Sequence, residues 1–278
     1  MSSADKKYNE LMKQILSTGV WDHGQQVRPR WADGTPAYTK SIINAKITFL
    51  PNELPLLTQK EVKAKTATKE ILWIWQKKSN VVQELRDMGV KIWDQWEQAD
   101  GTIGKAYGYQ LGKKCRMLQG EKVDQVDYLI YMLKNNPGSR RLITTLWDPD
   151  DLDEMSLEPC VWHTHWQVVG GQLHLTVGIR SNDAFIGNPF NMYQYHVIHR
   201  AIAQVTGHPL GTLTFNIDNL HIYDRHIKLV EQQITLPEYE QPELVVNPDV
   251  KNFYDFTPED FQLIRYEHGP FIKAEVAE

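Results

Sequence analysis

The sequence predicts one α+β domain with a substantial β-sheet, and three observations favour that class. Residues 172–180 alternate apolar and polar side chains, as a strand with one buried face does. Residues 188–206 carry apolar side chains at helical spacing between Pro189 and Gly207, which suit the start and the end of a helix. No repeat, low-complexity tract or flexible linker divides the 278 residues. We therefore expect a single domain over residues 1–278.

The first eighty residues are expected to form two helices and a strand. Apolar side chains recur at helical spacing over residues 8–16, and Gly19 suits the end of that helix. A polar loop punctuated by proline and glycine follows, and the apolar run at 41–50 indicates a strand. Residues 65–80 indicate a second helix, in which Glu70 opens an apolar run.

The remaining chain adds two helices and most of the sheet. Residues 124–135 have helical periodicity and are ended by the breaker NNPG. Gly170-Gly171 indicates a hairpin between strands at 161–169 and 172–180. After the long helix already described comes the last predicted strand, at 211–223, and another strand is expected at 141–147.

Composition and charge argue against several classes of protein. A formal net charge of -5 argues against nucleic-acid binding as the main role. Cys115 and Cys160 form neither a CxxC pair nor a disulfide framework, which favours a reducing, cytoplasmic compartment. The charged N-terminus lacks the apolar core of a signal peptide, and no run approaches the roughly 20 apolar residues of a membrane span. We expect a cytoplasmic protein without a membrane span.

Phosphate binding, if present, must rest on arginines. Neither GxGxxG nor GxxxxGK[ST] occurs in the chain. Arg140 and Arg141 follow a turn and could hold a phosphate by forked hydrogen bonds, although adjacent arginines are also common on solvated surfaces. Arg28, Arg30 and Arg180 are further candidates.

The stretch LEPCVWHTHW, residues 157–166, allows three interpretations. Cys160 is either a small buried thiol or a nucleophile, and nearby arginines would favour the nucleophile by stabilising its thiolate. His163 and His165 alternate along a strand and so point to one side, as two metal ligands would. No third ligand with comparable spacing is evident. Spacing alone leaves these interpretations open.

Several motifs, taken together and in order, decide between them. The chain contains ILWIW, IWDQW, YGYQL, SRR, PC, RSNDAFIGNPFN and LHIY. This set resembles the thymidylate synthase family over most of the chain, and DGTP, DGTIG, KVDQVDYL and FYDFT are similar to its Bacillus-type branch. The resemblance implies a large mixed β-sheet covered by helices, the fold of that family.

The resemblance also implies a reaction. A member of this family methylates C5 of dUMP to give dTMP, with 5,10-methylenetetrahydrofolate as donor of both the carbon unit and the hydride, and needs no metal. Cys160 would add to C6 of the uracil ring as a thiolate. The catalytic residues implied with it are Glu70, Tyr107, Arg180 and Asn191. Asn191 would read the uracil through O4 and N3–H.

The family's binding residues map onto this chain by position. Arg28, Arg180 and Ser181 would hold the nucleotide phosphate, and Arg140 and Arg141 would reach it from the other subunit of a homodimer. These arginines are also expected to lower the pKa of the Cys160 thiol. His221 and Tyr223 would contact the deoxyribose. The folate side would be formed by Trp93, Trp96, Asp183, Ile186, Gly187 and Phe190.

The chain departs from the family pattern near the expected reacting centre. His165 stands where the branch has a glutamine beside the pyrimidine-reading amide, and Asp218-Asn219 replaces a glycine-aspartate pair. Glu278 replaces an apolar last residue that helps to close the site. Because water exclusion decides whether hydride or water adds to the exocyclic methylene, the alternative is a dUMP hydroxymethylase. Retention of Trp93 favours methylation.

A protein without catalytic activity is the alternative from another class. On the same fold it would be a regulator that binds nucleotides or RNA. The presence of Cys160, Glu70, Asn191 and the arginine set weighs against it.

Overall fold

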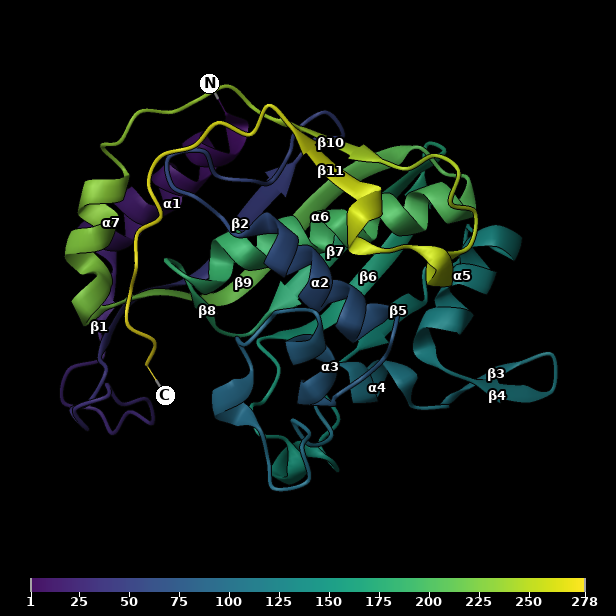
Figure 1. The fold of residues 1–278 in the computed structure, drawn as a ribbon, viewed down its shortest axis with the longest axis horizontal. Helices are drawn as coiled ribbons and strands as arrows, with labels where there is room; N and C mark the ends of the chain where they lie inside the picture. Colours follow the sequence, from purple (N-terminus) through teal and green to yellow (C-terminus); the bar gives the residue numbers. More distant parts are fainter. Residues whose placement is uncertain (1, 278) are drawn as a thin grey trace.

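The computed structural model describes residues 2–277, and within them a seven-stranded mixed sheet forms the centre of the molecule (Figure 1). The strands run in the order β1-β2-β9-β7-β6-β5, and β8 pairs with β9 beyond β7. Their bounds are β1 (Val20–Trp21), β2 (Thr39–Phe49), β5 (Leu142–Thr145), β6 (Val161–Val169), β7 (Gln172–Ile179), β8 (Asn182–Asp183) and β9 (Leu210–Tyr223). Both β7 and β8 run parallel to β9, and the other pairs are antiparallel. The predicted α+β class with a large mixed sheet is confirmed.

The helices pack against this sheet (Figure 1). The four longest are α1 (Ser3–Thr18), α2 (Ala64–Trp75), α5 (Gln125–Asn135) and α6 (Gly187–Thr206). Shorter ones are α3 (Val82–Asp87), α4 (Gly108–Gly112), α7 (Ile227–Gln233) and the 3₁₀ turns η1 (Asp94–Trp96), η2 (Leu152–Glu154), η3 (Asp224–His226), η4 (Phe253–Asp255) and η5 (Pro258–Asp260). Two small ribbons complete the fold: β3 (Arg116–Leu118) with β4 (Glu121–Val123), and β10 (Glu243–Val246) with β11 (Phe261–Ile264). All four long helices agree with the predictions, whereas the short elements were not predicted.

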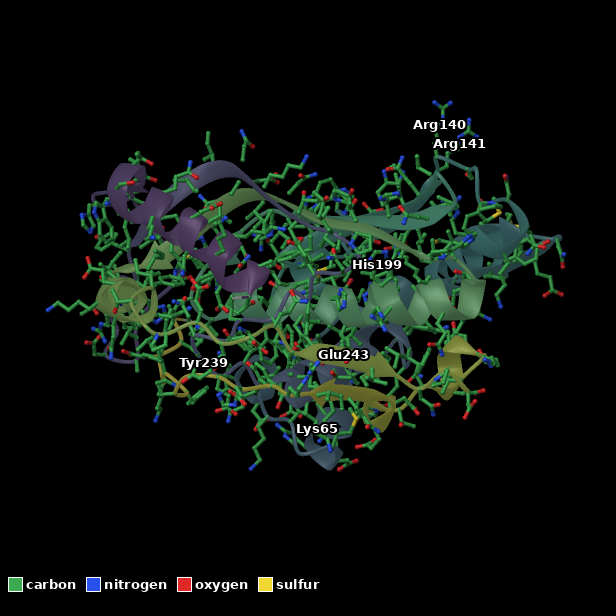
Figure 2. All side chains as sticks on the ribbon, turned by 90° about the horizontal axis from the view of Figure 1, so that it is seen from above. Lys65, Arg140, Arg141, His199, Tyr239 and Glu243 are labelled. Atoms are coloured by element: carbon green, nitrogen blue, oxygen red, sulfur yellow. The ribbon has the colours of Figure 1, made fainter. Side chains whose placement is uncertain are left out.

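The sheet has one face toward helices and one face away from them. Along β9, Leu213, Phe215 and Ile217 are buried and alternate with Asn216 and Asp218, which are exposed. Figure 2 shows α6 and the ribbon carrying Glu243 on one side of the sheet, and Arg140 and Arg141 on the other. Period-2 alternation in the sequence therefore corresponds to a core face and an open face.

Helix α6 connects the parallel strands and occupies the centre of the core. It leaves β7 through β8, crosses the sheet and returns as β9, which is the connection that a parallel pair needs. Fourteen of its side chains are buried, among them Met192, Val197, Ile198 and Ile202. It ends at Gly207, which has a φ of 76° that favours glycine. Burying each large apolar side chain contributes ~1.5–3 kcal/mol, so this packing fixes α6 firmly.

Among residues 2–277, no helix is both long enough and apolar enough to cross a bilayer.

Candidate active site

Cys160 lies between Pro159 and the first residue of β6, and its backbone is held on both sides. Its carbonyl oxygen accepts a hydrogen bond from the Arg180 backbone N–H at 2.9 Å. Its own N–H donates to the Tyr107 hydroxyl oxygen at 3.2 Å. The cysteine is half-buried and free of any disulfide. A free thiol fixed at the start of a strand suits the nucleophile that the sequence predicts.

Arg180 follows the end of β7, and its side chain is fixed beside Cys160. Nε donates to the Pro159 carbonyl oxygen at 3.0 Å, and Nη2 donates to the Glu158 carbonyl oxygen at 2.9 Å. The guanidinium also lies over the Trp147 ring, 5.4 Å from its centroid. Hydrogen bonds to the two residues that precede Cys160 therefore hold the predicted arginine next to the thiol.

The pKa of the Cys160 thiol is set by opposing influences. Burial raises this pKa above its ordinary value, while Arg180, the Tyr107 hydroxyl and Arg28 act to lower it. Burial has the larger effect in the single chain. Both arginines of this chain thus act in the predicted direction, but desolvation of the thiolate outweighs two guanidiniums and the pKa stays above its ordinary value.

Arg28 lies in the polar loop between β1 and β2 and is exposed. Its charge acts on both Cys160 and Tyr223, so the loop brings it to the same region. The competing Arg30 instead donates Nη1 to the Val27 carbonyl oxygen at 2.9 Å. The structure thus favours Arg28 over Arg30 as the loop arginine that faces the site.

Arg140 and Arg141 occupy the turn before β5 and are both exposed. Figure 2 shows their side chains projecting away from the body of the molecule, on the open side of the sheet. Within one chain they therefore do not join the group around Cys160.

A line of side-chain amides leads from Asn191 into the core. Asn191 Nδ2 donates to Gln194 Oε1 at 3.2 Å, and Asn191 Oδ1 accepts from Asn182 Nδ2 at 3.0 Å. Gln194 Nε2 donates to Glu70 Oε2 at 2.6 Å, and Trp93 Nε1 donates to Glu70 Oε1 at 2.7 Å. The structure therefore joins three predicted site residues, Asn191, Glu70 and Trp93, in one network.

Sequence reasoning missed Asn182 and Gln194. The sequence signal for Gln194 is its spacing from the candidate Asn191, because residues three apart on a helix share a face. Asn182 directly follows Ser181 in the RSNDAFIGNPFN motif.

Glu70 is buried in α2 beneath this network. Burial raises the pKa of its carboxyl group to about 7, and the hydrogen bonds from Trp93 and Gln194 offset part of that rise. A carboxyl group with a pKa near neutrality exchanges protons readily at the pH of a cell, as general acid–base chemistry requires.

Aromatic rings gather next to Glu70 and Cys160. The Trp93 ring lies 5.3 Å from that of Trp96 and 5.2 Å from that of Tyr107, both in edge-to-face geometry. Tyr107 has a φ of 47°, a value rare for a residue with a side chain. Such strain persists only where surrounding contacts enforce it, and it is common at functional sites.

The predicted folate-side residues after β7 are also close together. Asp183 Oδ1 accepts hydrogen bonds from the backbone N–H groups of Phe185, at 2.8 Å, and Ile186, at 3.3 Å, which shapes the start of α6. Ile186 and Phe190 line a cavity of about 230 Å³. Its lining also includes Lys60, Pro189, Phe271, Ile272 and Val276. A Cβ atom added at Gly187 would lie 4.0 Å from Asn191 Oδ1, so this glycine borders the amide network.

His221 and Tyr223 lie at the end of β9 with their rings edge to face, 5.2 Å apart. His221 Nδ1 shares a hydrogen bond of 2.9 Å with Asn219 Oδ1. The register of β8 with β9 pairs Asp183 with His221. Asn219, one of the departures from the family pattern, thus orients a predicted substrate-binding histidine, while Asp218 is exposed.

His165 does not lie beside the Asn191 amide, the place that the resemblance implied for it. It alternates along β6 with Thr164 and Trp166, which are buried, so its side chain points to the open face of the sheet. There His165 Nε2 lies 3.2 Å from the Arg140 carbonyl oxygen. The amide of Asn191 is held by Asn182 and Gln194 instead.

Within residues 2–277, no group of three or more His, Cys, Asp or Glu side chains is placed to hold a metal ion. His163 packs over Gly178, where an added Cβ atom would lie 2.0 Å from the imidazole Cε1. Glu278 lies outside the described residues.

Comparison with known proteins identifies the family. A family model described as thymidylate synthase matches residues 6–278. The thymidylate synthase of Bacillus phage phi3T and thymidylate synthase 1 of Bacillus subtilis strain 168 are each 57% identical to this chain over 278 residues, which span both chains completely. The solved structure of thermostable thymidylate synthase A from Bacillus subtilis matches with a TM-score of 0.96 at 57% identity, covering 99% of each chain. The resemblance carried by the motifs is therefore confirmed, and the chain belongs to the thymidylate synthase family.

Proposed function

We propose that this protein is a thymidylate synthase, which methylates dUMP to dTMP with 5,10-methylenetetrahydrofolate as co-substrate. One observation carries the proposal: a free cysteine beside a fixed arginine lies in the same region as an asparagine, a glutamine and a carboxyl group joined by hydrogen bonds. Family membership over residues 6–278 supports the same reaction.

In this proposal Cys160 attacks C6 of the uracil ring as a thiolate. Its raised pKa means that only a small thiolate fraction is present in the single chain, and further positive charge from a second subunit would increase that fraction. Addition at C6 makes C5 a carbon nucleophile, which takes the one-carbon unit from the folate. Loss of the C5 proton and departure of the folate leave an exocyclic methylene. Hydride from the folate reduces that methylene to methyl as the bond between Cys160 and C6 breaks, giving dTMP and dihydrofolate. Glu70 and the Tyr107 hydroxyl group act on the protons that this sequence requires.

Substrate recognition divides between two chains. Arg28, Arg180 and Ser181 hold the phosphate within one chain, and Asn191, His221 and Tyr223 hold the uracil and the deoxyribose. Arg140 and Arg141 serve the site of a partner subunit, which agrees with their exposure and with their direction away from their own site. The active form is then a homodimer built across the open face of the sheet.

The folate side is formed by Trp93, Trp96, Asp183, Ile186, Gly187 and Phe190. The rings of Trp93 and Trp96 offer flat apolar surface to a pterin, and Asp183 offers a carboxylate. The cavity lined by Ile186 and Phe190 extends this surface toward the C-terminal segment.

Only the substitutions relative to the family pattern favour hydroxymethylation, and no structural observation adds to them. His165 points away from the amide network, and the relatives that match the whole chain are named thymidylate synthases. Methylation is therefore the reaction that we propose.

Product identification tests the reaction. After incubation of the protein with dUMP and 5,10-methylenetetrahydrofolate, mass spectrometry should find dTMP, and the absorbance of dihydrofolate should rise in equal amount. The Cys160→Ser variant should form no product, because the alcohol is far less nucleophilic than the thiolate. A product with one more oxygen than dTMP, without dihydrofolate, would refute methylation.

We further propose that the whole chain, residues 1–278, works as one catalytic domain in the cytoplasm. Both cysteines are free, which suits a reducing compartment.

A further inference from the structure

Gln194 lies between two residues of the proposed mechanism and contacts both. On one side its Nε2 is 2.6 Å from Glu70 Oε2, and on the other its Oε1 is 3.2 Å from Asn191 Nδ2. Nε2 also lies 3.5 Å from the Ala67 carbonyl oxygen. The residue is only 3% exposed, so water does not compete for these bonds.

The direction of the Gln194 amide follows from its neighbours. The Ala67 carbonyl oxygen can only accept hydrogen bonds, and so can Glu70 once it is ionised above its pKa of about 7, so the atom of Gln194 that faces both is the NH₂ group. The carbonyl oxygen of Gln194 then faces Asn191 and can only accept from it.

The contact with Asn182 favours the same orientation of the Asn191 amide as the contact with Gln194 does. Asn188 Nδ2 donates to Asn182 Oδ1 at 2.7 Å, which leaves the NH₂ group of Asn182 to donate to Asn191 Oδ1 at 3.0 Å. If the Asn191 amide turned over, its oxygen would face the Gln194 oxygen and its nitrogen would face the Asn182 nitrogen. Both hydrogen bonds would be lost.

In this arrangement each polar atom of the Asn191 side chain can make one further hydrogen bond. Nδ2 has a second hydrogen, and Oδ1 has a second lone pair. A uracil ring offers an acceptor at O4 and a donor at N3, which matches this pair of groups. A cytosine ring offers an acceptor at N3 and a donor at N4, and would need the opposite amide orientation.

We infer that Gln194, together with Asn182, is a specificity-determining positioning residue that fixes the Asn191 amide in the orientation that selects uracil over cytosine nucleotides. This inference rests on the proposed function, because it assumes that Asn191 faces the pyrimidine. Gln194 itself touches no substrate and acts through Asn191 and Glu70.

The test compares two variants of the full-length protein. Gln194→Met removes both hydrogen bonds while keeping an unbranched side chain. Gln194→Glu keeps an acceptor for Asn191 and deletes the donor to Glu70. The measurements are kcat/KM for dUMP and for dCMP, and the dissociation constants of both nucleotides by calorimetry.

Gln194→Met should lower the preference for dUMP over dCMP by roughly tenfold, the effect of one hydrogen bond of ordinary strength. Gln194→Glu should keep most of that preference, because its carboxylate still accepts from Asn191. The matched control is Gln204→Met, since Gln204 lies on the same helix and donates to the Asn247 and Val250 carbonyl oxygens, away from the site. The control should leave the preference unchanged.

The pH profile supplies a second readout. The hydrogen bond from Gln194 lowers the pKa of Glu70, so Gln194→Met should move the limb of the kcat profile that reports Glu70 to higher pH. The other titratable groups that act on Glu70 are Tyr107 and Tyr195, and burial raises the pKa of each above its usual value, so both stay neutral in this range. A purely structural role of Gln194 would move neither the preference nor this limb.

The outcomes separate this inference from the proposed function. If the wild-type protein makes no dTMP, the proposed function fails, and the calorimetric preference still tests the amide orientation. If it makes dTMP but Gln194→Met keeps the wild-type preference and pH limb, the inference is overturned. Should Gln194→Met fail to fold, Asn182→Ala removes the second contact of Asn191 and carries the same expectation of a lower preference.

Discussion

The two ionisable groups that the proposed mechanism needs are both held away from their ordinary pKa by burial. Cys160 has a raised pKa despite Arg180 and Arg28, and the carboxyl group of Glu70 has a pKa of about 7 despite two donated hydrogen bonds. Each group is therefore protonated over a wider pH range than a free side chain would be. For the thiol this slows attack, while for the carboxyl group it makes a proton available near neutral pH.

Glu70 should also affect stability in a defined pH window. Its folded-state pKa of about 7 exceeds its ordinary value of 4.5, so the folded chain holds a proton that the unfolded chain has released. This contribution is fully present below pH 4.5 and is lost as pH rises through about 7. Glu70→Gln should abolish this pH-dependent part of the free energy of unfolding. In the wild type, that part amounts to at most ~3 kcal/mol between low and high pH.

Urea unfolding of both proteins at pH 4.5 and pH 8 measures this contribution. Other titrating groups are common to the two proteins and cancel in the comparison. Equal pH dependence of the wild type and of Glu70→Gln would show that burial does not raise this pKa.

Elements of the fold position these residues by close backbone contact. The segment that carries Tyr107 enters α4 at Gly108, which packs directly on the backbone of another segment. A Cβ atom at Gly108 would lie 2.1 Å from the Ser79 carbonyl oxygen and 2.6 Å from the Ser79 nitrogen. The strained backbone of Tyr107 is therefore held by a contact that only glycine permits.

Gly108→Ala should accordingly reduce both stability and activity. Overpacking typically costs ~1–3 kcal/mol, and displacement of Tyr107 would alter its contact with Cys160. Thermal unfolding and kcat for dTMP formation are the measurements. In Gly138→Ala the added methyl group meets nothing within 4 Å, so the melting temperature of this control should not change. Equal melting temperatures for the two variants would contradict the packing explanation.

At the scale of the whole molecule, strands of the sheet carry exposed apolar side chains that the partner subunit of the proposed homodimer would cover. Ile43 on β2, Ile143 on β5 and Trp162 on β6 are 73%, 48% and 37% exposed, although they are large and apolar. Apolar side chains gathered on a sheet face are typical of a subunit interface. Arg140 and Arg141 project on the same side (Figure 2).

Mixing of inactive chains tests whether a partner completes the site. Cys160→Ser lacks the nucleophile and Arg141→Ala lacks a guanidinium that we assign to the partner's site. In a hybrid dimer, the site with the intact cysteine would receive the intact arginine. Random re-pairing should therefore restore about one quarter of wild-type sites. If re-paired mixtures stay as inactive as the separate variants, Arg141 does not act across subunits.

Helices and strands were predicted well from the sequence, whereas side-chain orientations and long-range contacts were predicted less well. Alternation at 172–180 and helical spacing at 188–206 follow from local geometry, so both elements appear where expected. The bond between Gln194 and Glu70 joins residues 124 positions apart, and no local pattern reports it. His165 was expected beside the Asn191 amide but lies on the other face of the sheet, and which face α6 covers cannot be read from the sequence of β6. The raised pKa of Cys160 depends on burial, which only the packed chain defines.

In the crossover from β7 through α6 to β9, the position of the site residues depends on the number of residues at the start of α6 as well as on their identity. An α-helix turns by about 100° per residue, so one residue inserted between Gly187 and Asn191 would rotate the start of the helix relative to its buried stripe. Asn191 and Gln194 would then leave Asn182 and Glu70, or the core side chains of the helix would turn outward. We expect homologous sequences to vary here by substitution and to place their insertions and deletions in loops such as the one that carries Arg28.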